Sequence, residues 1–169
     1  CTMLSFITTD AAITKEALQK ALSDDVNDTY NMISVDGDTS TNDSVVLLAN
    51  GMAENEVITV DSESYKTFAE ALHEINEYLA KKIAGDGEGA TALFEVTVVG
   101  ADTKETAKTL AKSIVCSNLT KAAIAGHDAN WGRILCAMDI PEHSLTRKRW
   151  ICSSRARQER SRSSKMVQR

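Results

Sequence analysis

The chain has 169 residues, 43% of them hydrophobic and 25% charged, which is typical of one ordinary globular domain or two small ones. This balance excludes a collagen, a coiled coil and a disordered chain. No apolar run approaches the roughly 20 residues that span a bilayer, and no signal segment is recognised. We therefore expect a soluble, cytoplasmic protein. The four cysteines are widely spaced and predict neither a disulfide framework nor a metal site: Cys1, Cys116, Cys136 and Cys152.

The net charge of -5 is the average of two unlike segments. Residues 1–138 carry 21 acidic and 10 basic residues, a net charge of -11, whereas residues 139–169 carry 3 acidic and 9 basic residues, a net charge of +6. Arg133 is the only arginine before residue 139, and seven follow it. We therefore separate a region 1–138 from a basic tail 139–169, and expect a subdomain break near residues 85–92.

The first elements in chain order are a strand and a helix. Residues 2–9 alternate apolar and polar side chains and are rich in β-formers, which predicts a strand. Thr14 is a suitable N-cap for a helix over residues 14–27. Three apolar residues recur at every fourth position on one face of that helix: Leu18, Leu22 and Val26.

A short strand and a loop are expected next. Residues 33–35 predict a short strand, and residues 36–43 are turn and cap formers. Oxygen-bearing side chains alternate in this loop as in a calcium loop, but Thr41 and Leu47 replace the required glycine and glutamate, which disfavours calcium. Residues 44–49 are compatible with a buried strand or a helix, because short apolar runs do not discriminate.

The clearest predicted element is a helix over residues 62–84. One apolar stripe runs along it at 3-4-3-4 spacing and contains Tyr65, Phe68, Leu72, Ile75 and Leu79. His73 lies beside this stripe and is interpreted as a surface or boundary residue, not a catalytic base. Gly85 ends the helix, and residues 93–99 predict a strand with Phe94, Val96 and Val98 on one side.

Helical character dominates the rest of the acidic region. Asp102 is placed as the N-cap of a helix whose buried face contains Leu110, Ala111, Ile114 and Val115. Residues 117–125 continue in helical style, residues 126–133 are rich in turn formers, and residues 134–138 are apolar. Strands that alternate with helices predict an α/β or α+β fold.

Spacing alone identifies no catalytic motif, because the chain lacks a G-x-S-x-G elbow, a Walker loop, an H-E-x-x-H pair and a G-x-G-x-x-G loop. Four longer blocks nevertheless occur in a recognisable order. They are Cys1-Thr2-Met3-Leu4 with Phe6 and Thr8-Thr9-Asp10-Ala11, Asp36-Gly37-Asp38-x-Ser40-Thr41-Asn42-Asp43, Asp86-Gly87-Glu88-Gly89-Ala90-Thr91 and Asp128-Ala129-Asn130-Trp131-Gly132-Arg133. Together they span residues 1–138 nearly end to end. The set resembles the β chain of the ornithine acetyltransferase / glutamate N-acetyltransferase enzymes of arginine biosynthesis.

This resemblance implies a layered, self-processing fold of the N-terminal-nucleophile kind. The precursor cuts itself before a threonine, which here is the Cys1–Thr2 bond. Thr2 then becomes the catalytic nucleophile. Its free α-amine, with a pKa near 7.7–8.0, can take the hydroxyl proton at neutral pH, so the nucleophile has to be the first residue.

The implied reaction is a ping-pong acetyl transfer from N2-acetylornithine to glutamate through an acetyl-threonine. Acetyl-CoA is a co-substrate in some members, and no cofactor or metal is implied. Glu88 matches the substrate-binding glutamate, although Ala92 stands where a lysine is common. Asn42 and Asp43 are assigned as loop caps. Without the resemblance, Thr2 is an ordinary strand residue and Glu88 a solvated acid.

The resemblance also implies a partner, an α chain cut from the same precursor, in a heterotetramer of two α and two β chains. The α chain supplies oxyanion donors, and losing one such donor typically costs ~10²–10³ in rate. This chain alone is therefore predicted to be an inactive fragment. Two alternatives stay open: a related self-processing aminopeptidase, and an inactive remnant.

The basic tail has two interpretations. One lost base after the codon of Met138 would turn the family's Gly-Tyr-Ser-Gly-Ala into Asp139-Ile140-Pro141-Glu142-His143 and would also generate arginines. The favoured hypothesis is therefore a frameshifted tail. The other interpretation is a basic arm that binds nucleic acid, which we disfavour. Under either one, residues 139–169 contain too few apolar residues to fold alone and are expected to be disordered or poorly packed.

Overall fold

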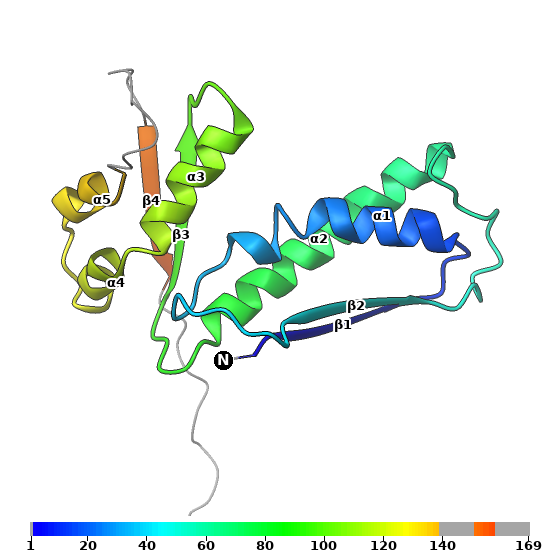
Figure 1. Ribbon diagram of the computed structural model, residues 1–169, viewed down its shortest axis with the longest axis horizontal. Helices are drawn as coiled ribbons and strands as arrows, with labels where there is room; N and C mark the ends of the chain where they lie inside the picture. Colours follow the sequence, from blue (N-terminus) through cyan, green and yellow to red (C-terminus); the bar gives the residue numbers. More distant parts are fainter. Residues whose placement is uncertain (1, 139–150, 158–169) are drawn as a thin grey trace, which may run out of the picture. The chain divides into compact units, whose positions relative to one another are not determined.

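The computed structural model describes residues 2–138 and 151–157 (Figure 1). The chain divides into two compact units, Cys1–Ala84 and Gly85–Arg169. The boundary lies at the start of the range 85–92. Helices and strands are mixed in both units, which confirms the predicted α/β class. No helix in the described ranges is long and apolar enough to cross a membrane.

The first unit is built on two parallel strands. β1 (Leu4–Thr9) pairs with β2 (Ser44–Ala49), so that Leu4 lies opposite Ser44. Parallel neighbours need a long crossover connection, and α1 (Lys15–Asp25) supplies it here. The pairing shows that residues 44–49 form a strand and not a helix.

Two helices cover one face of this sheet. α2 (Glu63–Gly85) and α1 lie on the same side of β1 and β2 (Figure 1). Ile7 of β1 forms the centre of the core with Ala21 of α1 and Leu72 of α2. Partly buried side chains pack around them: Val45, Leu47, Tyr65, Phe68 and Leu79. The opposite face of the sheet carries largely exposed apolar side chains: Leu4, Phe6 and Leu48.

Residues 33–35 do not form the predicted strand. The chain instead makes one 3-10 turn, η1 (Tyr30–Met32), closed by the Met32 N–H that donates to the Thr29 carbonyl at 3.0 Å. Tyr30 in this turn is buried, with 6% of its surface exposed.

The buried faces of α1 and α2 differ in detail from the predicted stripes. In α1 the buried residues are Ala17 and Ala21, and Leu18 and Leu22 are only partly covered. The helix therefore presents to the core a face about one residue away from the one expected. Small alanines allow the helix to approach the sheet closely, which explains the shift. Thr14 is the N-cap as predicted, accepting from the Ala17 N–H.

The second unit contains the predicted strand and three helices. β3 (Leu93–Val99) matches the prediction at both ends. α3 (Lys104–Val115), α4 (Asn118–Ala125) and α5 (Trp131–Met138) follow it. Leu110, Ile114 and Met138 form the core, and the predicted face of β3 packs against them through Phe94, Val96 and Val98.

Two local predictions in this unit are corrected. The N-cap of α3 is Thr103, not Asp102, because the Thr103 hydroxyl accepts from the Thr106 N–H at 3.1 Å. The turn-rich block also ends earlier than expected, at Trp131, where α5 begins. Arg133 then donates from Nη1 to the Leu119 carbonyl at 2.9 Å and ties α5 to α4.

Part of the basic tail is described. β4 (Ile151–Arg157) pairs antiparallel with β3, with Val99 opposite Ile151, where the sequence predicted disorder. Strand pairing uses backbone groups, so the edge of β3 can bind a segment with few apolar residues. Residues 139–150 and 158–169 lie outside the described residues. The frameshift stays a prediction.

Candidate functional site

Thr2 is exposed and lies two residues before Leu4, where β1 begins. Its hydroxyl oxygen Oγ1 lies 2.8 Å from the hydroxyl oxygen of Ser40, a residue 38 positions away in the sequence. Ser40 belongs to the loop that leads into β2. The two hydroxyls meet because β1 and β2 run in the same direction and begin side by side.

The backbone next to Thr2 is held from both sides. The Met3 N–H donates to Oδ1 of Asp43 at 2.8 Å, and the Met3 carbonyl accepts from the Ser44 N–H at 2.9 Å. Asp43 was expected only to cap its own loop. It instead fastens the loop to the segment that carries Thr2.

The loop is also organised internally. The Asp38 N–H donates to Oδ1 of Asp36 at 2.9 Å, and this hydrogen bond lowers the pKa of the Asp36 carboxyl below its ordinary value. The Asn42 N–H donates to Oγ of Ser40 at 3.2 Å. Gly37, at φ of 87°, occupies the left-handed region that favours glycine. Local hydrogen bonds therefore set the shape of the loop that presents Ser40.

Glu88 lies in a tight turn of the second unit. The Ala90 N–H donates to the Gly87 carbonyl at 2.8 Å, and Gly89 has a φ of 71°. The Glu88 side chain is exposed. Thr2 thus belongs to the first unit and Glu88 to the second. Of these two side chains, the one with a hydrogen bond described above is that of Thr2. Cys1 lies outside the described residues.

No metal site is formed by the side chains of the described residues, among which no three His, Cys, Asp or Glu residues gather closely enough to hold an ion. Cys116 and Cys136 are free and exposed.

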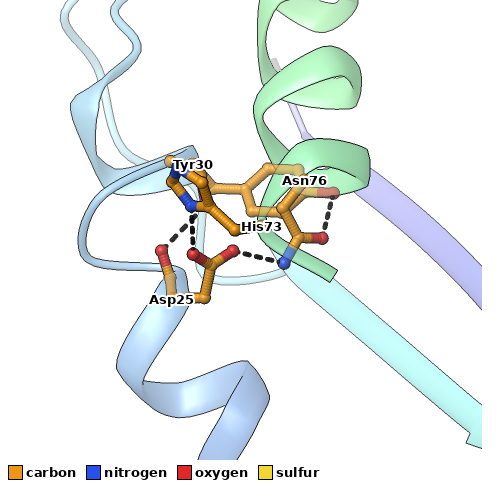
Figure 2. A network of polar contacts seen from close by, with 5 residues as sticks. Asp25, Tyr30, His73 and Asn76 are labelled. Atoms are coloured by element: carbon orange, nitrogen blue, oxygen red, sulfur yellow. Dashed lines mark hydrogen bonds and ion pairs between the residues drawn. The ribbon is translucent and has the colours of Figure 1, made fainter. Parts of the chain in front are cut away.

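A chain of buried polar side chains connects β1 with the turn after α1 and with α2, and Figure 2 shows two of its members, Tyr30 and Asn76. The hydroxyl of Ser5 is 2.9 Å from that of Tyr30, which donates to Oδ1 of Asn76 at 3.3 Å. Because Tyr30 has one proton and Asn76 Oδ1 can only accept, Ser5 must be the donor to Tyr30. Burial raises the pKa of the Tyr30 phenol above its ordinary value.

The same chain continues to the surface at the end of α1. Asn76 donates from Nδ2 to Oδ2 of Asp25 at 2.6 Å, and Nδ1 of His73 lies 2.5 Å from Oδ1 of the same carboxyl (Figure 2). His73 is half exposed, as expected for a boundary residue. Sequence reasoning missed Asn76 and Ser40. The sequence indicates Asn76 only as a polar residue beside the apolar stripe of α2. It indicates Ser40 only through its place in the block of residues 36–43 that carries the family resemblance.

The family model described as "ArgJ family" matches residues 1–153. The arginine biosynthesis bifunctional protein ArgJ 1 of Clostridium acetobutylicum is 58% identical over 137 residues, which are 81% of this chain and 34% of that protein. The ArgJ protein of Thermotoga neapolitana is 54% identical over 136 residues, 80% of this chain and 34% of that protein.

One solved structure is also similar. The crystal structure of the arginine biosynthesis bifunctional protein from Bacillus halodurans has 54% sequence identity and a TM-score of 0.76, covering 81% of this chain and 64% of that chain. The chain spans about a third of the length of the curated relatives it matches. The similarity therefore covers most of this chain and a limited part of each relative.

Proposed function

Because the chain belongs to the ArgJ family, we propose that it forms the nucleophile-bearing region of an acetyltransferase of arginine biosynthesis. The observation that carries this proposal is the exposed hydroxyl of Thr2, held at 2.8 Å from Ser40 on a backbone that Asp43 and Ser44 fasten. A nucleophile needs this combination of access and fixed direction.

In the proposed mechanism the Cys1–Thr2 bond is cut first, which frees the α-amine of Thr2. That amine takes the hydroxyl proton while Oγ1 attacks the acetyl carbonyl carbon of N2-acetylornithine. Ornithine leaves with the proton, and an acetyl-threonine ester remains. The amine of glutamate then attacks the ester, which gives N-acetylglutamate and returns Thr2. Acetyl-CoA is a second candidate donor.

Other groups are needed to complete the site. The carboxylate of Glu88 suits the ammonium group of an amino-acid substrate, and its exposed turn leaves it accessible. An α chain would supply oxyanion donors, and two α and two β chains would form the enzyme. The length of the relatives, about three times the matched segment, leaves room for such further parts. The isolated 169-residue chain is expected to be inactive.

The test uses a chimeric full-length protein in which residues 1–138 of this chain replace the matching segment of the Clostridium acetobutylicum relative. Thr2→Ala should abolish self-cleavage and lower acetyl transfer by at least about 10³-fold, because no other group replaces the nucleophile. Thr8→Ala is the matched control, since Thr8 is an exposed threonine on β1, the strand that follows Thr2. Gel mobility reports cleavage, and ornithine release from N2-acetylornithine with glutamate reports transfer.

Two results would count against the proposal. One is transfer that persists in Thr2→Ala, and the other is a folded, unmutated chimera that transfers no acetyl group. Hydrolysis of small peptide amides by that chimera would favour the related aminopeptidase instead. For Glu88, the Glu88→Gln variant should raise KM for the amino-acid substrate, and Glu105→Gln, at an exposed position of α3, should leave KM unchanged.

A further inference from the structure

We propose that Ser40 is a positioning residue that directs the Thr2 hydroxyl and donates a hydrogen bond to its oxygen when the acetyl-threonine bond breaks. The inference rests on the proposed nucleophilic role of Thr2. Its basis is the 2.8 Å contact between Oγ of Ser40 and Oγ1 of Thr2, which joins the loop before β2 to the segment before β1.

The hydrogen bonds of Ser40 favour a donor role toward Thr2. A serine hydroxyl has one proton and two acceptor positions. The Asn42 N–H occupies one acceptor position of Oγ at 3.2 Å. A hydroxyl that accepts in this way becomes a stronger donor, because successive hydrogen bonds polarise one another. The Ser40 proton can therefore point at Oγ1 of Thr2 with increased donor strength.

The surroundings of this pair keep its geometry fixed. Asp43, three residues after Ser40, accepts from the Met3 N–H at 2.8 Å, and the Ser44 N–H donates to the Met3 carbonyl at 2.9 Å. These two contacts attach both chain segments to each other beside the hydroxyl pair. Little rotation of Thr2 relative to Ser40 is left, so the hydroxyl is oriented before substrate binds.

Ser40 has the same role in both halves of the reaction, because each half forms or breaks the bond between Oγ1 of Thr2 and the acetyl carbon. When Thr2 attacks, Oγ1 forms the bond to the acetyl carbon and its proton passes to the α-amine and then to the departing ornithine. When glutamate attacks, the glutamate nitrogen bonds to that carbon, the C–Oγ1 bond breaks, and the electron pair returns to Oγ1. The glutamate amine supplies the proton through the α-amine. Ser40 keeps its own proton throughout and stabilises the negative charge on Oγ1 both when this bond forms and when it breaks.

The experiment measures kcat, KM and acetyl-threonine accumulation in the chimeric full-length protein. Ser40→Ala should lower kcat by roughly tenfold, the effect of one hydrogen bond in the transition state, with KM unchanged within about twofold. Mass spectrometry should show little change in the acetylated fraction of Thr2 at steady state, because acetylation and deacetylation slow together. Thr39→Ala removes the neighbouring exposed hydroxyl of the same loop and should behave like the unmutated protein.

A second pair of variants separates the hydroxyl from the shape of the side chain. Ser40→Thr keeps the hydroxyl, and Ser40→Val has the shape of threonine without a hydroxyl. The threonine variant should therefore keep most of the unmutated kcat, and the valine variant should not. Equal kcat in these two variants, or a Ser40→Ala kcat within twofold of the unmutated value, overturns the proposal. Those results leave the role of Thr2 intact, whereas an active Thr2→Ala variant overturns the proposed function itself.

Discussion

The two units of this chain are stabilised by different kinds of interior. In the second unit the cluster around α3 consists of apolar side chains: Leu110, Ile114 and Met138. In the first unit the apolar core of Ile7, Ala21 and Leu72 lies next to a buried chain of hydrogen bonds from Ser5 to Asp25. Apolar contacts tolerate small shifts, whereas each buried donor requires its acceptor.

The buried hydrogen bonds of the first unit lie next to the strand that follows Thr2. Ser5 lies on β1, three residues after Thr2, and its side chain is 6% exposed. Through Tyr30 and Asn76 it connects β1 to the turn after α1 and to α2. The strand that presents the candidate nucleophile is therefore fixed against two other elements by directional contacts. We infer that the first unit has a more narrowly defined arrangement than an apolar core alone would give.

The largest expected effect is in the apolar core of the second unit. Leu110→Ala should lower the free energy of unfolding by about 2–5 kcal/mol, because Leu110 is 1% exposed and its loss leaves a cavity. Leu119→Ala, at a leucine that is 63% exposed, is the control and should change it by less than about 0.5 kcal/mol. Urea unfolding with amide hydrogen exchange measures both variants. If both variants lost the same free energy of unfolding, burial of Leu110 would not be what stabilises the second unit.

The next effect tests the polar chain of the first unit. Asn76→Asp puts a second carboxyl within 2.6 Å of Oδ2 of Asp25, so one of the two must bind a proton in the folded state. A cost of about 1–4 kcal/mol is expected at pH 7, corresponding to a pKa shift of roughly one to three units.

The direction of the pH dependence follows from that raised pKa. The folded variant binds a proton that the unfolded variant releases at pH 7, so the cost should shrink as pH falls toward about 4, where the unfolded carboxyl begins to bind that proton as well. The exposed Asn118→Asp serves as the control and should show no such dependence. A cost of Asn76→Asp that is the same at pH 4.5 and pH 7 would argue against direct contact between the two carboxyls.

A smaller effect is expected at Tyr30. Burial raises the pKa of its phenol above the ordinary value of 10.0, so its contribution to stability is complete below pH 10 and is lost as pH rises through the folded pKa. Tyr30→Phe should lower the free energy of unfolding by about 1 kcal/mol at neutral pH. Its stability should also fall less steeply than that of the unmutated protein as pH rises into the alkaline range. Tyr78→Phe, at a tyrosine that is 60% exposed, should do neither. Thermal unfolding between pH 8 and pH 11 is the measurement.

The smallest effect belongs to the surface of α2. Nζ of Lys81 lies 2.9 Å from Glu77, and this hydrogen bond lowers the pKa of the Glu77 carboxyl. The pair therefore stabilises the fold at pH values above the ordinary carboxyl pKa. This contribution is lost as pH falls through the lowered pKa of Glu77. Because both side chains are half exposed, Lys81→Ala should cost at most about 0.5 kcal/mol at pH 7. Lys66→Ala, at a 3.7 Å pair, should cost still less in the same urea titration.

Local patterns predicted the elements better than the contacts between them. Residues 93–99 alternate so regularly that both ends of β3 were predicted correctly. The stripe of α2 was correct in general, but Asn76 is fully buried and Ile75 is 46% exposed. Burying an amide is favourable only when partners are present, here Asp25 and Tyr30, which lie 46 to 51 positions away in the sequence.

The candidate site shows the same limit. The interest in Thr2 came from the resemblance of its block, since composition and periodicity make it an ordinary strand residue. Its contact with Ser40 depends on the parallel register of β1 and β2, which a single strand pattern does not contain. The sequence also left residues 44–49 open between helix and strand, and the register could not be deduced while that element was undecided.

The parallel register of β1 and β2 has a consequence for how this chain can change over evolutionary time. Leu4 lies opposite Ser44, and only residues 41–43 separate Ser44 from the hydroxyl that meets Thr2. Inserting or deleting one residue there would displace that hydroxyl by up to about 3.3 Å while the sheet stayed paired. This short segment should therefore accept changes of side chain more readily than changes of length.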